Sequence, residues 1–366
     1  MTEQSAFQMR RLGVLMTPEP GNPQEVEGVL NPGGARGRDG AFYLLPRLVG
    51  KGNYSRIGIA RVHFDNAGDP TSVERLGIAL EPETEYETGG CEDPRVSYFS
   101  AIDRYVMTYT ALSDRGPRVA MALSDDLFTW QRLGLVHFHP YRGTDLGDVP
   151  NKDAVVFPDP IPDDSGIPRL VMIDRPLFPE SEVLALAEQP SPRTVDLARE
   201  SLWVSFSHAE SMDNLEELCC FAQHYRLASP VAEWERVKVG GGTPPSLIKD
   251  GWLMLYHGVC RDVGGHGRQK RLRYSAAVLV LDRHDPRVIL YRSPEPILEP
   301  ELPEERDGLV ANVVFPTAID QRLDLGEPRR LDVYYGMADS RIGVASLFVP
   351  DGLPSGAVKD PHSGLV

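Results

Sequence analysis

The side chains of this sequence that are best suited to chemistry lie in short segments rich in Gly and Pro. Glu92 and Asp93 stand side by side in CEDPR, and neighbouring carboxyl groups can differ enough in pKa for one of them to donate a proton. Lys152 in NKDAVVFP and Arg175 in DRP are cations of the kind that hold phosphate or carboxylate oxygens. Together these residues suggest proton donation beside an anionic co-substrate.

Further polar side chains occur in similar segments along the chain. The candidates are Asn31, Arg47, Glu92, Asp93, Arg95, Lys152, Asp153, Arg175, Thr243, His257 and Asp339. Each residue type also has an ordinary structural role. Asp93 precedes Pro94, so its carboxylate can cap the backbone N–H groups of a turn. Lys, Arg and His are commonly surface or ion-paired side chains. A shared site therefore requires a fold that brings these segments together.

The order of the segments predicts such a fold. Each unit opens with a polar, Gly- or Pro-bearing stretch, continues as an alternating apolar strand, and returns in further strands. Five units cover residues 31–64, 91–134, 151–208, 240–293 and 311–349. Openers about 60 to 90 residues apart, with about four strands in each unit, predict an all-β protein, a five-bladed β-propeller. Because the inner strands of a propeller converge, we expect the candidates from all five openers to meet.

Other architectures fit this pattern less well. Amphipathic helices do not alternate with the strands, which disfavours a parallel β-α-β sheet, and a two-sheet sandwich does not explain the regular openers. The longest interval contains residues 177–199, which we expect to form a surface excursion. We therefore expect residues 1–366 to form one catalytic domain, with about 25 N-terminal and about 15 C-terminal residues as extensions.

Composition argues against several kinds of partner. The 366 residues include 38 Lys+Arg and 53 Asp+Glu, a net charge of -15, which disfavours nucleic-acid binding. No apolar run is long enough to cross a membrane, and residues 1–12 lack the apolar core of a secretory signal. The four cysteines show no zinc spacing, and we expect reduced thiols in a cytoplasmic protein. Nucleophile-elbow, HExxH and Walker motifs are missing from the sequence, so we expect no metal and no cofactor.

Taken as a set, the motifs resemble those of glycoside hydrolase family 130. They are NPGGA, LLPR, CEDPR, NKDAVVFP, DRP, GGGTPPSLIKDGWLMLYHGV and YYGMADSRIGVA, with SDDLFTW similar to a turn of five-bladed glycoside-active propellers. The resemblance extends from Asn31 to Val349. It implies an enzyme that cleaves β-mannosides. Most members are inverting phosphorylases that use inorganic phosphate and release α-mannose 1-phosphate, and some are hydrolases.

The resemblance also implies roles for individual residues. Asp93 matches the general acid, whose carboxyl must stay protonated through burial or the charge of Glu92. The family pattern implies that its proton passes through the O3 hydroxyl of the bound mannose. The residues that match the phosphate-binding side chains are Lys152, Arg175 and His257. The residues implied to bind the mannoside are Asn31, Arg47, Asp153 and Asp339.

One segment departs from the family pattern. Phosphorylases typically carry a lysine two residues after the double proline, whereas this chain has Ser246 and Leu247 there and Lys249 further on. A shift of two residues along a strand keeps the same face but moves a side chain by about 6–7 Å. Lys249 is therefore expected to miss the site unless a bulge restores it. In a hydrolase a second carboxylate must activate water, and Asp153 and Asp339 are the candidates. A propeller that binds carbohydrate without catalysis is the remaining alternative.

Three aromatic residues and one loop complete the expectations. Tyr54, Trp252 and Tyr256 are of types that stack on sugars, but the last two lie in a strand pattern typical of a core. The basic stretch 262–273 is expected to be an exposed loop, either solvated or contributing to an acceptor site or a subunit contact. The resemblance implies a homo-oligomer.

Overall fold

The computed structural model describes residues 6–141, 145–147, 149–178, 200–209, 211–212, 214–215, 217–261 and 272–359. Residues 179–199, in the expected excursion, and 262–271, in the expected basic loop, lie outside this set. The prediction of an all-β protein is confirmed, because helical structure in the described residues is limited to single turns. These turns are η1 (Glu85–Glu87), η2 (Ser100–Ile102), η3 (Glu217–Cys219), η4 (Glu233–Glu235), α3 (Pro303–Arg306) and η5 (Leu323–Leu325). None of these described helices has the length and apolar character needed to span a membrane.

Most of the described strands fall into five groups, which follow the sequence order apart from the N-terminal strand. A parallel bridge between Ser55 and Gly90 joins the first two groups into one sheet. The first contains β2 (Gly28–Arg36), β3 (Phe42–Gly50), β4 (Tyr54–Phe64) and β5 (Pro70–Leu80). The second contains β6 (Gly90–Phe99), β7 (Arg104–Ser113), β8 (Gly116–Ser124) and β9 (Gln131–Leu135). The third contains β11 (Asn151–Val156), β14 (Val171–Pro176), β15 (Leu202–Ser207), β16 (Cys220–Ala228) and the short parallel β10 (His137–Phe138).

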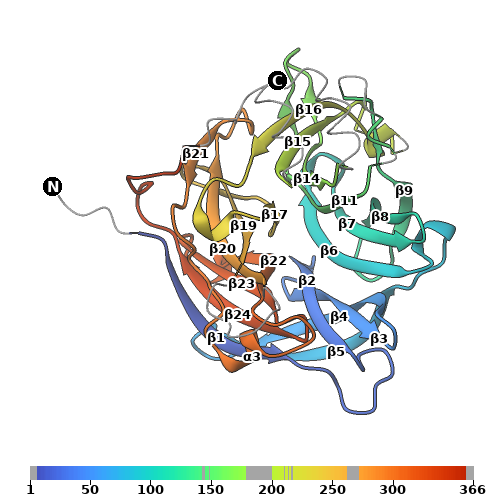
Figure 1. Ribbon diagram of the computed structural model, residues 1–366, viewed down its shortest axis with the longest axis vertical. Helices are drawn as coiled ribbons and strands as arrows, with labels where there is room; N and C mark the ends of the chain where they lie inside the picture. The colour runs from blue at the N-terminus through green and yellow to red at the C-terminus, as the bar shows by residue number, and fades with distance from the viewer. Residues whose placement is uncertain are drawn as a thin grey trace.

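The last two groups follow the same plan. The fourth contains β17 (Lys238–Gly241), β18 (Ser246–Ile248), β19 (Gly251–Arg261), β20 (Leu272–Leu281) and β21 (Ile289–Arg292). The fifth contains β22 (Val314–Gln321), β23 (Arg330–Met337), β24 (Arg341–Phe348) and β1 (Gln8–Met16). A small ribbon of β12 (Ile161–Pro162) and β13 (Pro168–Arg169) stands apart from the groups. Figure 1 shows the groups around a common centre, with β2, β6, β11, β17 and β22 nearest to it.

The core is divided into clusters that lie between neighbouring groups. Strand β14 shows why, because Val171 and Ile173 face the fourth group while Met172 faces the second. Alternate residues of a strand point to opposite faces, so a strand buried on both faces is apolar throughout. The clusters join group one to two, two to three, three to four and four to five. A further cluster containing Phe42 and Tyr334 packs the fifth group against the first and closes the circle.

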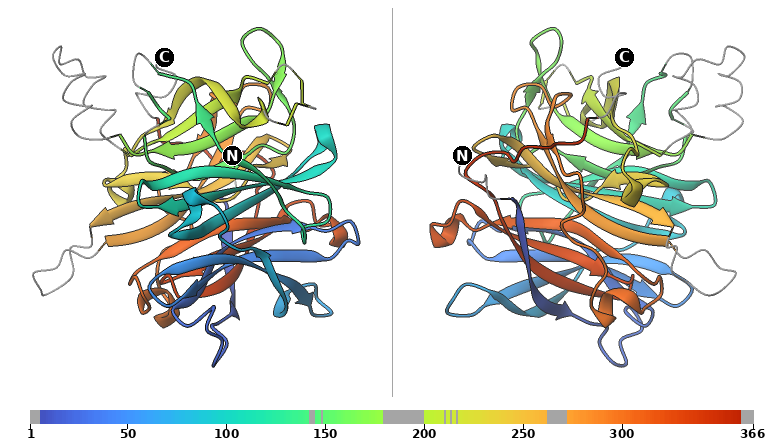
Figure 2. Two further views of the ribbon diagram at one scale, coloured as in Figure 1. Left: turned by 90° about the vertical axis from the view of Figure 1, so that its right-hand side faces the viewer. Right: turned by 60° about the vertical axis from the view of Figure 1, so that its left-hand side comes forward.

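The N-terminal strand β1 belongs to the last group. Gln8 pairs with Phe348 and Met16 with Ile342, so β1 and β24 are antiparallel neighbours although they come from opposite ends of the chain. Figure 2 shows the blue β1 beside the red strands of this group. The N-terminal segment that was expected to be an extension therefore contributes an outer strand.

Three of the groups each contain a buried network of the same kind, centred on a glutamate. In the fourth group Glu235 accepts hydrogen bonds from Tyr256 Oη at 3.0 Å, Arg292 Nη2 at 2.7 Å and two backbone N–H groups at 3.0 Å. The corresponding sets are Glu87, Tyr109 and Arg132 in the second group, and Glu305, Tyr335 and Arg11 in the fifth. Arg11 comes from β1, so the N-terminal strand also supplies the cation that completes its group.

Replacing Glu235 with Gln tests this network. The substitution removes the carboxylate that faces the buried Arg292 guanidinium, so we expect the free energy of unfolding to fall by about 3–5 kcal/mol. The control is Glu233→Gln, because that side chain is 79% exposed and pairs only across the surface; its loss should cost less than about 1 kcal/mol. Urea denaturation measures both variants, and equal losses would contradict the assignment.

Candidate active site

Backbone bulges on the inner strands aim three predicted residues at the centre. The pairing of β2, β6 and β11 shifts register next to Asn31, Asp93 and Asp153. These residues have φ values of 41°, 47° and 57°, in the left-handed region that side chains other than Gly rarely adopt. Asp339, in the turn after β23, has φ 49°. Such strained positions recur at functional sites, because a bulge redirects a side chain out of the sheet.

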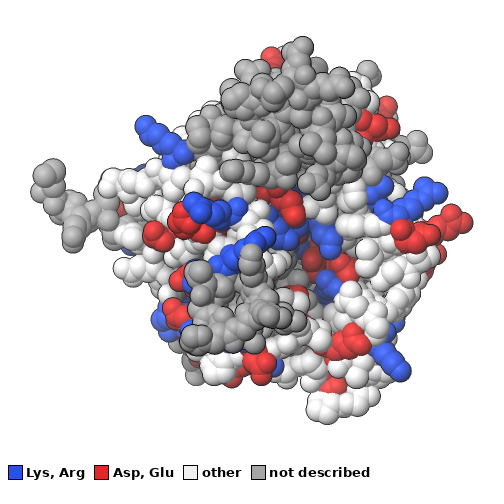
Figure 3. All heavy atoms as spheres, viewed as in Figure 1, with Lys and Arg blue, Asp and Glu red and all other residues white. Residues whose placement is uncertain are grey.

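The redirected side chains line a central cavity of about 310 Å³. Figure 3 shows Lys, Arg, Asp and Glu side chains gathered in a hollow on this face. Eight of the eleven candidates line the cavity: Asn31, Arg47, Asp93, Lys152, Asp153, Arg175, His257 and Asp339. The other three, Glu92, Arg95 and Thr243, are buried and are not part of its lining. The convergence of distant openers is therefore confirmed as geometry, whereas the chemical roles of the residues stay predictions.

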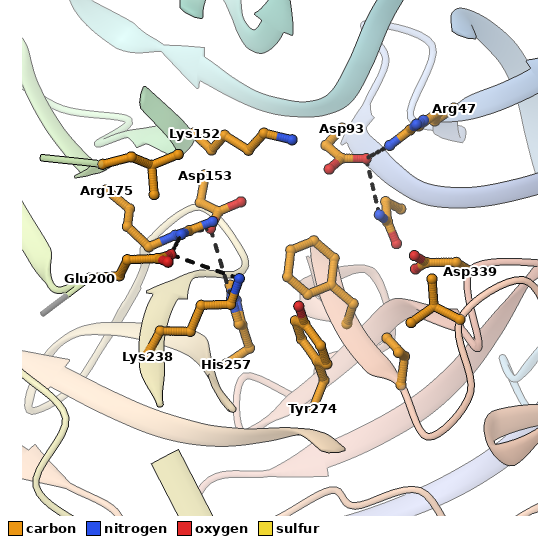
Figure 4. A pocket seen from close by; sticks show the side chains of 15 residues that line it. Arg47, Asp93, Lys152, Asp153, Arg175, Glu200, Lys238, His257, Tyr274 and Asp339 are labelled. Carbon is orange, nitrogen blue, oxygen red and sulfur yellow. Dashed lines mark hydrogen bonds and ion pairs between the residues drawn. The ribbon is translucent and has the colours of Figure 1, made fainter. Parts of the chain in front are cut away.

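Asp93 lies in one half of the cavity and is held by two neighbours. Asn31 Nδ2 donates to Asp93 Oδ1 at 3.0 Å, and Arg47 Nη1 donates to the same oxygen at 3.1 Å. Arg47 also contacts Glu92 through Nη2 at 2.7 Å. Figure 4 shows Asp339 on this side of the cavity, facing the same space as Asp93. This half presents carboxylates at defined positions to a bound molecule.

The opposite half gathers nitrogen donors. Arg175 Nε donates to Asp153 Oδ2 at 2.7 Å, and its Nη1 contacts Glu200. Lys238 Nζ lies 3.7 Å from Glu200 Oε2 and 5.5 Å from the centre of the Tyr274 ring. Figure 4 shows these groups facing Asp93 and Asp339 across the cavity. The half around Asp93 thus presents carboxylates to a ligand, whereas the half around Arg175 presents nitrogen donors, which suit an anion.

Close packing at Gly240 brings His257 against Asp153. A Cβ atom on Gly240 would lie 2.2 Å from His257 Cε1 and 2.4 Å from Asp153 Oδ2, so a larger residue would displace both. His257 Nε2 lies 3.8 Å from Asp153 Oδ2. Burial lowers the pKa of His257 to about 3 despite the charge of Asp153. The imidazole is therefore neutral at pH 7 and offers an anion an N–H group rather than a positive charge.

The two carboxylates in the first half differ in acidity. Burial favours protonation of Asp93, but the charges of Arg47, Arg95 and Lys152 outweigh it and lower its pKa. The expectation that Asp93 has a raised pKa is therefore wrong for the unliganded protein. Asp339 behaves oppositely, because burial and then the charge of Asp93 raise its pKa to about 6.

Seven residues that line the cavity were not among the predicted ones, and three of them are polar: Glu200, Lys238 and Tyr274. Lys238 stands two residues before the Gly240–Gly242 run, and that proximity to an opener was a usable signal. Tyr274 and Glu200 had no such signal, because Tyr274 lies on β20, which pairs with β19 and β21 away from the opener of its group, and Glu200 directly follows residues 179–199. Burial lowers the pKa of Lys238 to about 8, helped by the neighbouring charge of Arg175.

Other candidates lie away from the cavity. Lys249 misses the site, because its Nζ points to the Asp351 carbonyl at 3.5 Å on the exterior. Trp252 and Tyr256 are core residues, as the strand pattern indicated. Tyr54 is exposed and packs against Arg56 instead of lining the cavity.

Comparison with known proteins agrees with this arrangement. A family model described as beta-1,4-mannooligosaccharide phosphorylase matches residues 10–351. The chain belongs to glycoside hydrolase family 130. This family 130 chain is 32% identical over 320 residues to 1,2-beta-oligomannan phosphorylase of Thermoanaerobacter sp. (strain X514), covering 86% of this chain and 88% of the relative. It is 31% identical over 291 residues to beta-1,2-mannobiose phosphorylase of the same strain, covering 78% and 76%.

Solved structures show the same fold. The beta-1,2-mannobiose phosphorylase of Listeria innocua, in complex with beta-1,2-mannobiose, matches this family 130 chain with a TM-score of 0.68 at 24% identity. The match covers 93% of this chain and 96% of that one. The resemblance inferred from the motifs is therefore confirmed at the level of the family.

The raised pKa of Asp339 predicts a pH-dependent cost to stability in this family 130 protein. An Asp side chain in the unfolded chain has a pKa of about 3.9, whereas that of Asp339 in the folded protein is about 6. The folded state therefore loses stability as the pH rises between these two values, and the whole loss remains at higher pH. Asp339→Asn should therefore raise the melting temperature at pH 8 and give little gain near pH 4. Thermal denaturation at both pH values measures this, with the exposed Asp351→Asn as control. A gain that does not depend on pH would contradict it.

Proposed function

We propose that this chain is an inverting β-mannoside phosphorylase, in which inorganic phosphate cleaves a β-mannosyl linkage to give α-mannose 1-phosphate. One observation carries the proposal: a single cavity holds Asp93 and Asp339 on one side and the cationic or N–H groups of Arg175, Lys238 and His257 on the other, with the amino group of Lys152 reaching toward Asp93. Inversion requires the proton donor and the nucleophile on opposite faces of the sugar.

The halves of the cavity divide the reaction between them. Asn31, Arg47 and Asp339 hold the mannose, and Asp93 gives a proton to the glycosidic oxygen, through the sugar's O3 hydroxyl as the family pattern implies. A phosphate oxygen held by Arg175 and Lys238 attacks C1 from the other side. The new C1–O bond forms as the glycosidic bond breaks, and the leaving sugar keeps the proton. Arg175 suits this task because a guanidinium holds two phosphate oxygens at once.

The low pKa of Asp93 in the unliganded protein is compatible with an acid role once phosphate binds. Lys152 is one of the charges that lower this pKa, and its amino group points toward Asp93 (Figure 4). A phosphate dianion beside Lys152 offsets that charge and adds repulsion, and both effects raise the pKa of Asp93. Proton donation is then coupled to the presence of the nucleophile.

The fold proposed for this activity is a five-bladed β-propeller formed by residues 1–366 as one domain. The five groups of strands act as blades, and the apolar clusters between successive groups, including the last and first, support a closed ring. The recurring Glu–Tyr–Arg networks support repetition of a unit. We propose cytoplasmic localisation on the free cysteines and a homo-oligomer on the family resemblance alone.

Inverting hydrolysis is the second candidate function. Asp153 and Glu200 pair with Arg175 in the half of the cavity that gathers nitrogen donors. A carboxylate there can activate a water molecule, which then takes the place of phosphate as the nucleophile. The relatives named for β-1,2-linked substrates and the family model described for β-1,4-linked ones leave two linkages to compare.

The two functions are separated by the products from mannobiose. The protein is incubated with β-1,2- or β-1,4-mannobiose, with and without inorganic phosphate, and the sugars are separated by anion-exchange chromatography. We expect mannose 1-phosphate and one equivalent of mannose only when phosphate is present. Mannose released equally without phosphate would establish hydrolysis, and no product from either substrate would favour a binding protein.

Substitution of Asp93 tests the acid. Asp93→Asn keeps the shape and the contact with Arg47 but removes the transferable proton, so kcat should fall by about 100-fold to 10,000-fold. Mannobiose binding, measured by calorimetry, should change little. Asp339→Asn is the matched variant across the same half of the cavity. An active Asp93→Asn together with an inactive Asp339→Asn would move the acid role to Asp339.

A further inference from the structure

The side chain of Glu200 lies in the half of the cavity that contains Arg175 and Lys238. Its Oε2 contacts Arg175 Nη1 and lies 3.7 Å from Lys238 Nζ. The Val239 N–H donates to the Glu200 carbonyl at 3.1 Å, which fixes the backbone of Glu200 beside β17. A carboxylate thus satisfies two of the groups best placed to hold phosphate (Figure 4).

The second carboxylate on Arg175 is arranged differently. Asp153 contacts Arg175 Nε at 2.7 Å and its side chain is 4% exposed, whereas the Glu200 side chain is 35% exposed. Asp153 is enclosed by Gly240 and His257 and has no room to leave. Glu200 is at the edge of the cavity, where a rotation about its side-chain bonds places the carboxylate in water. Moving a partly exposed carboxylate costs less than moving a buried one, because water can replace part of the contacts that it loses.

The charges in the cavity explain why such a carboxylate is needed. Arg47 and Lys152 pair with Glu92, and Arg47 also with Asp93. Arg175 pairs with Asp153, and the carboxylate beside Lys238 is that of Glu200. Glu200 adds to this pairing, so the unliganded cavity avoids an uncompensated cluster of cations. A phosphate dianion brings its own negative charge and needs the same N–H groups, so it and Glu200 compete for them.

We propose that Glu200 is an internal competitor of phosphate, which pairs with Arg175 and Lys238 in the empty enzyme and must swing away before phosphate binds. This inference rests on the proposed function, since it names the residue that sets the affinity of that site for its anion. Glu200 acts on the reaction through Arg175 and Lys238, and it is a positioning residue rather than a catalytic one.

The test compares the wild type with Glu200→Gln. The amide keeps the size of the side chain but removes the competing charge, so we expect KM for phosphate to fall by about threefold to tenfold. KM for mannobiose should change by less than about twofold, because Glu200 lies in the other half of the cavity. Glu301→Gln is the matched control: it also removes one exposed carboxylate paired with an arginine, but far from the cavity, and it should leave both constants unchanged.

A separate binding measurement keeps the two proposals distinguishable. Calorimetric titration with inorganic phosphate alone should show tighter binding to Glu200→Gln than to the wild type, whether or not either protein turns over mannobiose. Phosphate binding without mannose 1-phosphate formation would overturn the proposed function and leave the competition intact.

Three results would overturn the competition itself. An unchanged or raised KM and Kd for phosphate in both Glu200→Gln and Glu200→Ala would show that Glu200 orients Arg175 for phosphate. Lack of phosphate binding by both proteins would leave no competition. Loss of phosphate-independent mannose release in Glu200→Gln would make Glu200 a general base. Glu200→Ala serves as a second variant, with the same tightening expected, should the glutamine still hold Arg175 through its carbonyl.

Discussion

Mutual neutralisation of charges in the central cavity is the interaction on which the site depends. Arg47, Lys152, Arg175 and Lys238 are brought close together with Asp93, Asp153 and Glu200 in about 310 Å³. Clustered like charges removed from water are costly unless opposite charges lie beside them. Each cation that serves a substrate must therefore have an internal partner when the substrate is absent. The site is consequently preorganised by contacts that its ligands have to replace.

Other buried charges of the sheets are paired with one another away from the cavity. The Glu–Tyr–Arg networks link the turns preceding three groups to middle and outer strands. Of the bulges at Asn31, Asp93 and Asp153, the one at Asp93 lies in the second group, which contains such a network, whereas the other two lie in the first and third groups. All three of these unusual backbone conformations line the central cavity, and strained positions are typical of functional sites.

Acidity within the site is a collective property. Asp93 and Asp339 face the same space, yet the pKa of the first is lowered and that of the second is raised to about 6. The difference arises from position, since Asp93 touches Arg47 directly, while burial dominates at Asp339 and the charge of Asp93 adds to it. Any anion that enters the cavity alters both values, which links binding at one half to proton transfer at the other.

The sequence by itself determined the all-β class, the order of the openers and eight residues that line the cavity, because repetition and local motifs mark the polar segments at the openers and on the strands that follow them. It did not reveal Glu200 or Tyr274, which enter from segments without an opener, nor the pairing of β1 with β24, which joins chain ends that no local pattern relates. The sign of the Asp93 pKa shift was also decided by tertiary structure. It depends on Arg47, Arg95 and Lys152, which approach from β3, β6 and β11, and electrostatic interactions follow distance in space rather than in sequence.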